Sequence, residues 1–170
     1  EDMDLDAWER MLRTNLTGVF LSCQAEGRAM LRHGRGAIVN VASMAAYAPL
    51  SSLNAYCTSK AAVYMFSDCL RAELDAAGIG LTTICPGVVN TNIVSATGFH
   101  APQGRNSAVA GRRAQLERMF AMRDYRPEKV AAAILSAVRR NKPIRPVTPE
   151  AYLLYGTSRI LPQALRSTAR

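Results

Sequence analysis

Cysteine and histidine, the residues that build disulfide frameworks and most metal sites, are scarce in this sequence. Its 170 residues include two histidines and four cysteines, which are Cys23, Cys57, Cys69 and Cys85. No two cysteines form a C-x-x-C pair, and they lie in apolar stretches, which argues against a metal site and a disulfide framework. We therefore predict no bound metal and a reducing, cytoplasmic environment.

Long hydrophobic runs and biased segments are missing as well. Charged residues interrupt the apolar stretches well before the roughly 18 residues that a membrane span needs. Glycine and proline are not enriched, and nothing is repeated. With 49% hydrophobic residues, the chain is long enough for one globular domain and too short for two. We predict a single soluble domain over residues 1–170.

The positive charge belongs to the second part of the chain. Residues 1–100 carry seven Lys and Arg against nine Asp and Glu, whereas residues 101–170 carry fourteen against four. No nucleic-acid motif or aromatic stacking pattern accompanies this basic tail, so we predict no nucleic acid partner. A solvated face, or a surface that meets anionic lipid or a partner domain, remain the alternatives.

The hydrophobic pattern predicts an α/β fold. Apolar residues recur at helical spacing from Asp6 to Leu31 and again from Asn54 to Ala77. Ala37–Val41 and Leu81–Cys85 are short apolar strands, and Gly78 to Gly80 should end the second helix. A strand, a helix and a strand within about fifty residues imply a right-handed parallel crossover.

Further elements are predicted after the second strand. Residues 95–125 should hold a substrate loop at Ala96–Arg112 and a short helix at Ala114–Met122, and residues 126–170 the C-terminal helices. Pro127 opens one helix at its first position, and Thr148 caps another that Pro162 must kink or break. Lys142 to Val147 is the candidate last strand.

Three side chains are predicted to meet at one reacting oxygen. Tyr56 and Lys60 are four apart, so on a helix the ammonium lies one turn from the phenol. A nearby cation favours the phenolate and lowers the phenol pKa from about 10, which suits a general acid or base. Ser43 ends a strand, where ligands bind in open parallel sheets.

These residues resemble a known family. Ser43, thirteen residues before Tyr56, together with Tyr56–Lys60 resembles the Ser…Tyr-x-x-x-Lys signature of short-chain dehydrogenases/reductases. Asn15–Phe20 resembles the family's Asn-Leu-x-Gly-x-Phe helix, and Pro86–Thr91 its Pro-Gly-x-Val-x-Thr turn. The resemblance covers most of residues 4–94, the predicted catalytic core, and implies a partial Rossmann-like, doubly wound parallel sheet flanked by helices.

The resemblance implies an oxidoreductase that interconverts a secondary alcohol and a ketone with NAD or NADP. Tyr56 would be the general acid or base, Ser43 would polarise the substrate oxygen, and Lys60 would tune Tyr56 and hold the nicotinamide ribose. Asn15 would hold a water that links Lys60 to solvent. The blander alternatives are a core tyrosine, a solvated lysine, a helix-capping serine and an asparagine that bonds nearby backbone.

The cofactor contacts implied by the resemblance are limited to the nicotinamide end. They are Tyr56, Lys60, Pro86, Gly87, Val89 and Thr91. The sequence has no Thr-Gly-x-x-x-Gly-x-Gly loop and no Asn-Asn-Ala-Gly strand, the family elements that cradle the pyrophosphate. We therefore expect the C-terminal part of a longer enzyme or a truncated product, with the first strand at an unpaired sheet edge and the choice of NAD or NADP unreadable.

The tail gives the remaining expectations. Pro146–Ala151 resembles actinobacterial members that act on hydrophobic or lipid-like substrates, some of them fused behind an epoxide hydrolase domain. The terminal helix could lie on a membrane surface or cover the substrate cleft. We predict a homo-oligomer through the two long helices. The rival to an enzyme is an inactive interaction module, a half-domain built around that interface.

Overall fold

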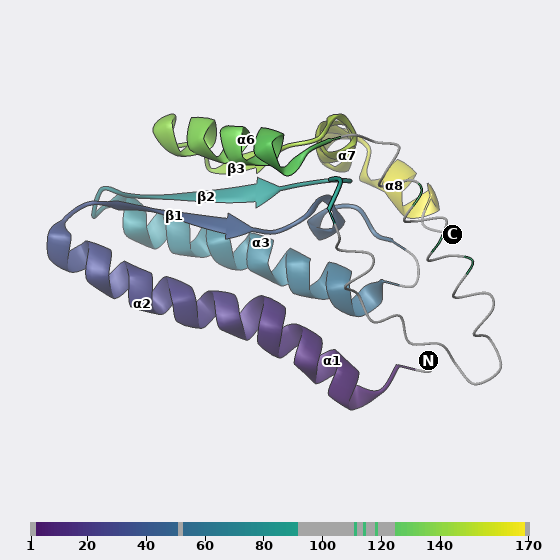
Figure 1. Ribbon diagram of the computed structural model, residues 1–170, viewed down its shortest axis with the longest axis horizontal. Coiled ribbons are helices and arrows are strands. Elements are labelled where there is room, and N and C mark those ends of the chain that lie inside the picture. The colour runs from purple at the N-terminus through teal and green to yellow at the C-terminus, as the bar shows by residue number, and fades with distance from the viewer. Residues whose placement is uncertain are drawn as a thin grey trace.

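A computed structural model describes residues 3–50, 53–91, 111, 114, 118 and 125–168. Its centre is a three-stranded parallel sheet in the order β1-β2-β3 (Figure 1). The strands are β1 (Gly36–Val41), β2 (Ile79–Cys85) and β3 (Ile144–Pro146). The predicted α/β fold with a parallel sheet is confirmed. The predicted loop at 96–112 and most of the predicted helix at 114–122 lie outside the described residues.

Helices cover both faces of the sheet. One face carries two helical rods that lie side by side and run in the same direction, and α6 (Pro127–Arg139) covers the other (Figure 1). On the first face, α1 (Leu5–Leu12), a π-helical turn (Arg13–Thr17) and α2 (Gly18–His33) run as one rod beside α3 (Asn54–Asp75). The predicted helix from Asp6 to Leu31 therefore exists, with a π turn in its middle.

The core follows the alternation of side chains along β1. Ile38 packs with Leu74 and Leu81 on the side of α2 and α3, while Val39 packs against the α6 side. Because successive strand residues point to opposite faces, one strand supplies both halves of the core. Apolar residues at helical spacing in α3 complete the first half.

Two chain reversals differ slightly from the prediction. Gly34 and Gly78 have φ angles of 67° and 68°, a left-handed conformation that glycine adopts without steric cost. Gly80, which we expected to help end the helix, instead lies inside β2 opposite Ala37. That detail of the prediction was wrong because a single left-handed residue, Gly78, is enough to turn the chain.

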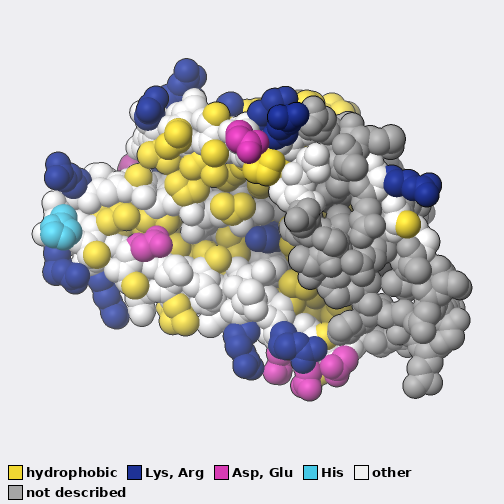
Figure 2. Space-filling view, viewed as in Figure 1, with side chains coloured by type: hydrophobic (Ala, Val, Ile, Leu, Met, Phe, Trp, Pro, Cys, Tyr) yellow, Lys and Arg dark blue, Asp and Glu magenta, His cyan; other side chains and the backbone are white. Residues whose placement is uncertain are grey.

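The outer edge of β1 is open within the part of the chain that the structure describes. β1 pairs there with β2 alone, as predicted. Val41 on β1 is 47% exposed and Leu135 on α6 is 58% exposed. Figure 2 shows hydrophobic side chains gathered between α6 and β1 on this side of the molecule. The apolar band marks the sheet edge as a surface without cover from the described residues.

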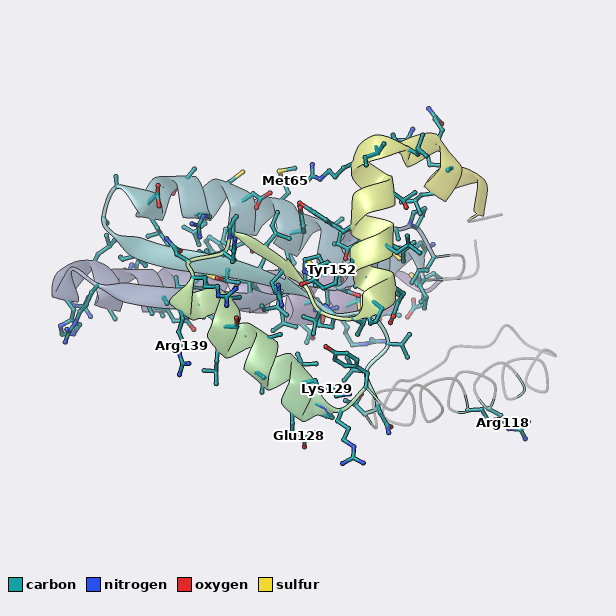
Figure 3. All side chains as sticks on the ribbon, turned by 90° about the horizontal axis from the view of Figure 1, so that it is seen from above. Met65, Arg118, Glu128, Lys129, Arg139 and Tyr152 are labelled. Carbon is teal, nitrogen blue, oxygen red and sulfur yellow. The ribbon has the colours of Figure 1, made fainter. Side chains whose placement is uncertain are left out.

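The C-terminal helices lie across the carboxyl end of the sheet. They are α7 (Pro149–Ile160) and α8 (Pro162–Thr168), which Pro162 separates as predicted. Seen from above, α7 crosses the direction of the strands, and Lys129 and Arg139 project outward from α6 (Figure 3). None of the helices among the described residues is long and apolar enough to span a membrane.

Candidate active site

The carboxyl ends of β1 and β2 lie side by side and carry the predicted site. The Ala42 N–H donates to the Ile84 carbonyl (2.8 Å), and the Met44 N–H donates to the Pro86 carbonyl (2.8 Å). These bonds continue the ladder past the last strand residues and join the two loops. In open parallel sheets this edge is where ligands bind, so the position agrees with the sequence prediction.

Ser43 caps a turn, one of the two roles that the sequence left open, and its side chain also lies beside Tyr56. Its backbone is extended and its Oγ accepts a hydrogen bond from the Ala45 N–H (3.2 Å), which caps a short 3-10 turn at Met44–Ala46. The same side chain is hydrogen-bonded to the phenol of Tyr56. Ser43 is only 8% exposed, so the cap fixes the hydroxyl beside the phenol. A serine that caps a turn is therefore still available for chemistry.

Lys60 and Tyr56 are neighbours on the first turns of α3. The Lys60 Nζ lies 5.9 Å from the centroid of the Tyr56 ring and donates to the Val41 carbonyl (2.9 Å). A hydrogen bond to the end of β1 anchors the lysine beside the site. The structure thus brings together Ser43, Tyr56 and Lys60, as their spacing predicted.

The pKa of Tyr56 differs from the expectation. Burial raises the pKa of the phenol above its usual value, and the hydrogen bond with Ser43 offsets part of that rise. Burial also lowers the pKa of the Lys60 ammonium. We expected Lys60 to lower the phenol pKa, but the group that lowers it here is Ser43 and not Lys60. Tyr56 is accordingly protonated at neutral pH.

Asn15 reaches the site through a serine that the sequence analysis missed. Asn15 lies in the π-helical turn, and its Nδ2 donates to the Ser59 Oγ (3.1 Å) and to the Met11 Sδ (3.2 Å). Ser59 is fully buried and donates in turn to the Tyr56 carbonyl (2.8 Å). The chain of bonds ties the first helix to the turn of α3 that holds Tyr56 and Lys60. Its only sequence signal was a serine next to the lysine.

The Pro86–Thr91 turn is held by the start of α7. The Val88 N–H donates to the Glu150 Oε1 (2.8 Å), and the Thr91 hydroxyl donates to the Val89 carbonyl (3.5 Å). A Cβ on Gly87 would come within 2.5 Å of the Glu150 Oε1. Glycine is therefore required here for close packing. The contribution of Glu150, 62 residues away, was not visible in the sequence.

The described residues fit one end of a dinucleotide. Lys60 is half-buried at the edge that carries Val89 and Thr91, and Thr91 is exposed just past β2. Hydroxyl, amide and ammonium groups at that edge suit a nicotinamide and its ribose. The pyrophosphate needs a glycine-rich turn before a helix, which the sequence does not contain. The fit is thus restricted to the nicotinamide end.

Comparison with known proteins points in the same direction. The sequence model described as short chain dehydrogenase matches residues 1–100. The protein named "Probable oxidoreductase EphD" from Mycobacterium tuberculosis is 65% identical over 170 residues, which are 99% of this chain and 29% of that protein. D-threitol dehydrogenase from Mycolicibacterium smegmatis is 46% identical over 93 residues, 55% of this chain and 36% of that protein. The chain thus spans about a third of the length of these relatives.

A solved structure agrees over the whole chain. A short chain dehydrogenase/reductase from Burkholderia phymatum, solved in complex with NAD, matches with a TM-score of 0.81 and 22% identity. The match covers 99% of this chain and 62% of that one. At this identity the likeness speaks for the fold, and it extends to the C-terminal helices that the sequence model does not reach.

Proposed function

Because this chain belongs to the short-chain dehydrogenase family, we propose that it carries the proton-transfer residues of an oxidoreductase that interconverts a secondary alcohol and a ketone. The observation that supports this most is the meeting of Ser43, Tyr56 and Lys60 at the carboxyl end of β1. Packing alone does not require a buried serine hydroxyl, a phenol and an ammonium at one sheet edge.

In this proposal Tyr56 exchanges the proton. Its raised pKa keeps the phenol protonated at neutral pH, so it can donate to the oxygen of a ketone as that oxygen gains charge. Ser43, held by its cap, donates a hydrogen bond to the same oxygen and polarises the carbonyl. In the reverse direction Tyr56 must first lose its proton, and its phenolate then takes the proton of the alcohol. NAD or NADP, when bound, supplies or accepts the hydride.

Lys60 and the Pro86–Thr91 turn are the proposed contacts to the nicotinamide end. Lys60 would hold the ribose hydroxyls and would also bring positive charge to the phenol. Pro86, Gly87, Val89 and Thr91 would contact the nicotinamide, with Gly87 keeping the turn close to α7. Asn15 would hold the relay water, and its bond to Ser59 keeps it beside the lysine turn. Either NAD or NADP is compatible with these contacts.

The test combines cofactor binding with turnover. NADH and NADPH are titrated into the chain while nicotinamide fluorescence is followed, and oxidation of the bound cofactor is then measured with a panel of ketones. We expect Tyr56→Phe to reduce turnover by about two orders of magnitude or more, the usual contribution of a general acid. Cofactor affinity should change little, because the phenyl ring is retained.

Tyr152→Phe is the matched control for loss of a hydroxyl. Tyr152 lies on α7, where its ring packs under the Arg145 guanidinium at 5.4 Å, outside the predicted site. This variant should keep both turnover and cofactor affinity. Turnover that survives Tyr56→Phe would remove Tyr56 from its role. An absence of cofactor binding by the unaltered chain would favour the second proposal.

The second proposal is an inactive interaction module. It is favoured by the open edge of β1 within the described residues and by α1, in which no side chain is buried. The exposed Leu5, Phe20 and Leu21 on the first two helices are 65%, 45% and 56% accessible, and they suit a homo-oligomer contact. Sedimentation velocity over a range of concentrations measures whether copies associate.

Other expectations from the sequence stay predictions. They are the division into a core at 1–94, a substrate segment at 95–125 and a tail at 126–170, together with the hydrophobic or lipid-like substrate. An upstream domain, a peripheral membrane contact and a cytoplasmic location belong to the same group. The described residues test none of them.

A further inference from the structure

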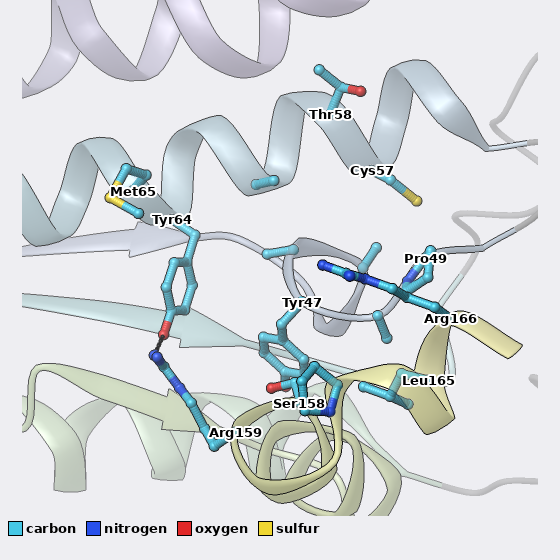
Figure 4. Close-up of a pocket in the computed structure, with 15 residues that line it drawn as sticks. Tyr47, Pro49, Cys57, Thr58, Tyr64, Met65, Ser158, Arg159, Leu165 and Arg166 are labelled. Atoms are coloured by element: carbon cyan, nitrogen blue, oxygen red, sulfur yellow. Dashed lines mark hydrogen bonds between the residues drawn. The ribbon is translucent and has the colours of Figure 1, made fainter. Parts of the chain in front are cut away.

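A pocket of about 660 Å³ opens beside α3, and none of the proposed reacting groups lines it. It lies between α3, the turn at 45–49 and the helices α7 and α8 (Figure 4). Cys57, Ala61 and Met65 line it from one stripe of α3, while Tyr56 and Lys60 do not line it. The volume falls within the roughly 300–1,000 Å³ of sites that take small molecules. The pocket is therefore a separate candidate site.

The floor of the pocket is aromatic and already hydrogen-bonded. The Tyr47 hydroxyl donates to the Ala151 carbonyl (2.9 Å), and the Arg159 guanidinium donates to the Tyr64 hydroxyl (2.8 Å; Figure 4). The Tyr47 and Tyr64 rings meet edge to face with centroids 6.3 Å apart. Because both phenol tips have partners, the two rings offer mainly carbon surface. The floor is also fixed before any ligand arrives.

The walls of the pocket are apolar, and the wall formed by α3 includes an exposed methionine. Alanine and proline side chains of the 45–49 turn face Ala61 and Met65 of α3 and Leu165 of α8. Met65 is 60% exposed, and its flexible thioether suits an irregular apolar ligand. Such walls favour an alkyl chain over a polar molecule.

The charge of the pocket has one sign. Arg159 and Arg166 line it, and no Asp or Glu is found among its lining residues, all of which the structure describes. Arg159 is engaged by Tyr64, stacks on the Tyr155 ring at 5.3 Å and feels the carboxylate of Asp68. Arg166 extends from α8 over the space between α3 and the turn that carries Tyr47 (Figure 4). Arg166 is thus the guanidinium placed to meet an anionic head group.

We propose that this pocket binds a monomeric alkyl carboxylate, with its chain on the apolar walls and its carboxylate on Arg166. A planar guanidinium pairs with a carboxylate through two parallel hydrogen bonds, which gives the site its preference for that head group. The site does not depend on the oxidoreductase proposal, since it uses none of the proposed reacting groups and needs no nicotinamide cofactor.

The experiment compares ligands that share one chain and differ in head group. Decanoate, decanol and decyltrimethylammonium are titrated by calorimetry into the 170-residue chain, the two ionic amphiphiles below their micelle concentrations and decanol below its solubility limit. We expect saturable decanoate binding about fivefold tighter than decanol binding, the effect of one solvent-accessible charged hydrogen-bonded pair. The cationic amphiphile should bind more weakly than decanol because of Arg166 and Arg159.

Two variants and one control locate the site. Arg166→Gln should bring decanoate affinity down to that of decanol and leave decanol binding unchanged. Ala61→Trp fills the space between the walls and should abolish binding of both, with circular dichroism checking that the chain stays folded. Arg140→Gln removes an exposed charge at the end of α6, outside the pocket, and should change neither affinity.

Three results would overturn the proposal. The first is decanoate binding no tighter than decanol binding. The second is decanoate binding that Arg166→Gln leaves intact while Arg140→Gln weakens it, which would assign the anion to the general basic tail. The third is co-sedimentation of the chain with phosphatidylglycerol vesicles without saturable decanoate binding, which would make the anion preference a membrane contact.

Discussion

The two faces of β1 near its carboxyl end differ sharply in polarity. On the side of α2 and α3, polar side chains are buried and paired. Ser43 is 8% exposed, and Ser59 and Ser67 are fully buried, with the Asn40 Nδ2 donating to the Ser67 Oγ (2.9 Å). On the side of α6, in contrast, Val41, the last residue of the strand, is 47% exposed. One strand thus carries polar groups inside and an apolar group outside.

The contrast shows which region of the chain has its side-chain arrangement fixed by its own residues. A buried polar group costs free energy unless it finds a partner, so a cluster of paired ones marks a region with one arrangement. An exposed apolar side chain has no such requirement and tolerates change. Substitutions at buried, closely packed positions around the carboxyl end should therefore cost much more stability than a substitution at the exposed Val41, and three variants test this.

Of these three variants, the largest effect is expected for Gly87→Ala in the turn after β2. The added Cβ would lie 2.5 Å from the Glu150 Oε1 and would also meet the Thr148 Oγ1, so the side chains that hold the turn and cap α7 must move. We expect a loss of about 2 kcal/mol in the free energy of unfolding, which is usual for overpacking. Urea denaturation followed by circular dichroism measures it.

Gly156→Ala is the matched control for that change. A Cβ on Gly156, inside α7, has nothing within 4 Å, so alanine should stabilise the helix by about 0.5–1 kcal/mol. Opposite signs for the two substitutions would support close packing of the turn by α7. A neutral Gly87→Ala would mean that the turn and α7 are not in contact as described.

A middle effect is expected for Ser59→Ala. The variant removes the acceptor of the Asn15 Nδ2 and the donor to the Tyr56 carbonyl at a fully buried position. A loss of about 1 kcal/mol follows from one net hydrogen bond, since the Asn15 amide keeps the Met11 sulfur as a weak partner. Thermal and urea unfolding measure the change.

Ser158→Ala is the control that separates the contribution of the Asn15–Ser59 bond from that of a serine-to-carbonyl bond within one helix. Ser158 donates to the Tyr155 carbonyl (2.7 Å) at the same spacing as Ser59 to Tyr56, but at a half-buried position of α7. Its loss should cost less than about 0.5 kcal/mol. Equal costs for the two serines would argue that the Asn15 bond contributes nothing to stability.

The sequence predicted the parts of the site that lie close together along the chain. The spacing of Tyr56 and Lys60 on one helix, and of Ser43 at a strand end, is set by local geometry, so it was readable. Pro127 and Thr148 likewise begin α6 and α7, as their chemistry predicted. The parallel sheet followed from the order of strand, helix and strand.

The rest depends on contacts between distant segments. The bond from Asn15 to Ser59 joins residues 44 apart, and the π-helical turn around Asn15 has no signal in its residue types. The Glu150 bond to the Val88 N–H depends on how α7 docks. The direction of the Tyr56 pKa depends on burial by several elements, which residue spacing does not reveal.

The smallest effect is expected for Val41→Lys, at the end of β1. Its side chain is 47% exposed, and a lysine can extend its ammonium into solvent from an edge strand. The free energy of unfolding should stay within about 0.5 kcal/mol of the unaltered chain. Val39, two residues earlier on the same face of β1, packs against the cluster of Ile84, Ala137 and Val147.

Val39→Lys is therefore compared with Val41→Lys on the same strand. Burying part of a lysine against that cluster should cost at least about 2 kcal/mol, whereas Val41→Lys should cost almost nothing. The difference between two valines of one strand would come from the cover that α6 gives to one and not to the other. If Val41→Lys proved as costly as Val39→Lys, the edge would be packed in solution, most simply by a second copy of the chain. A concentration-dependent unfolding midpoint would then distinguish that copy from cover within one chain, because association stabilises by mass action.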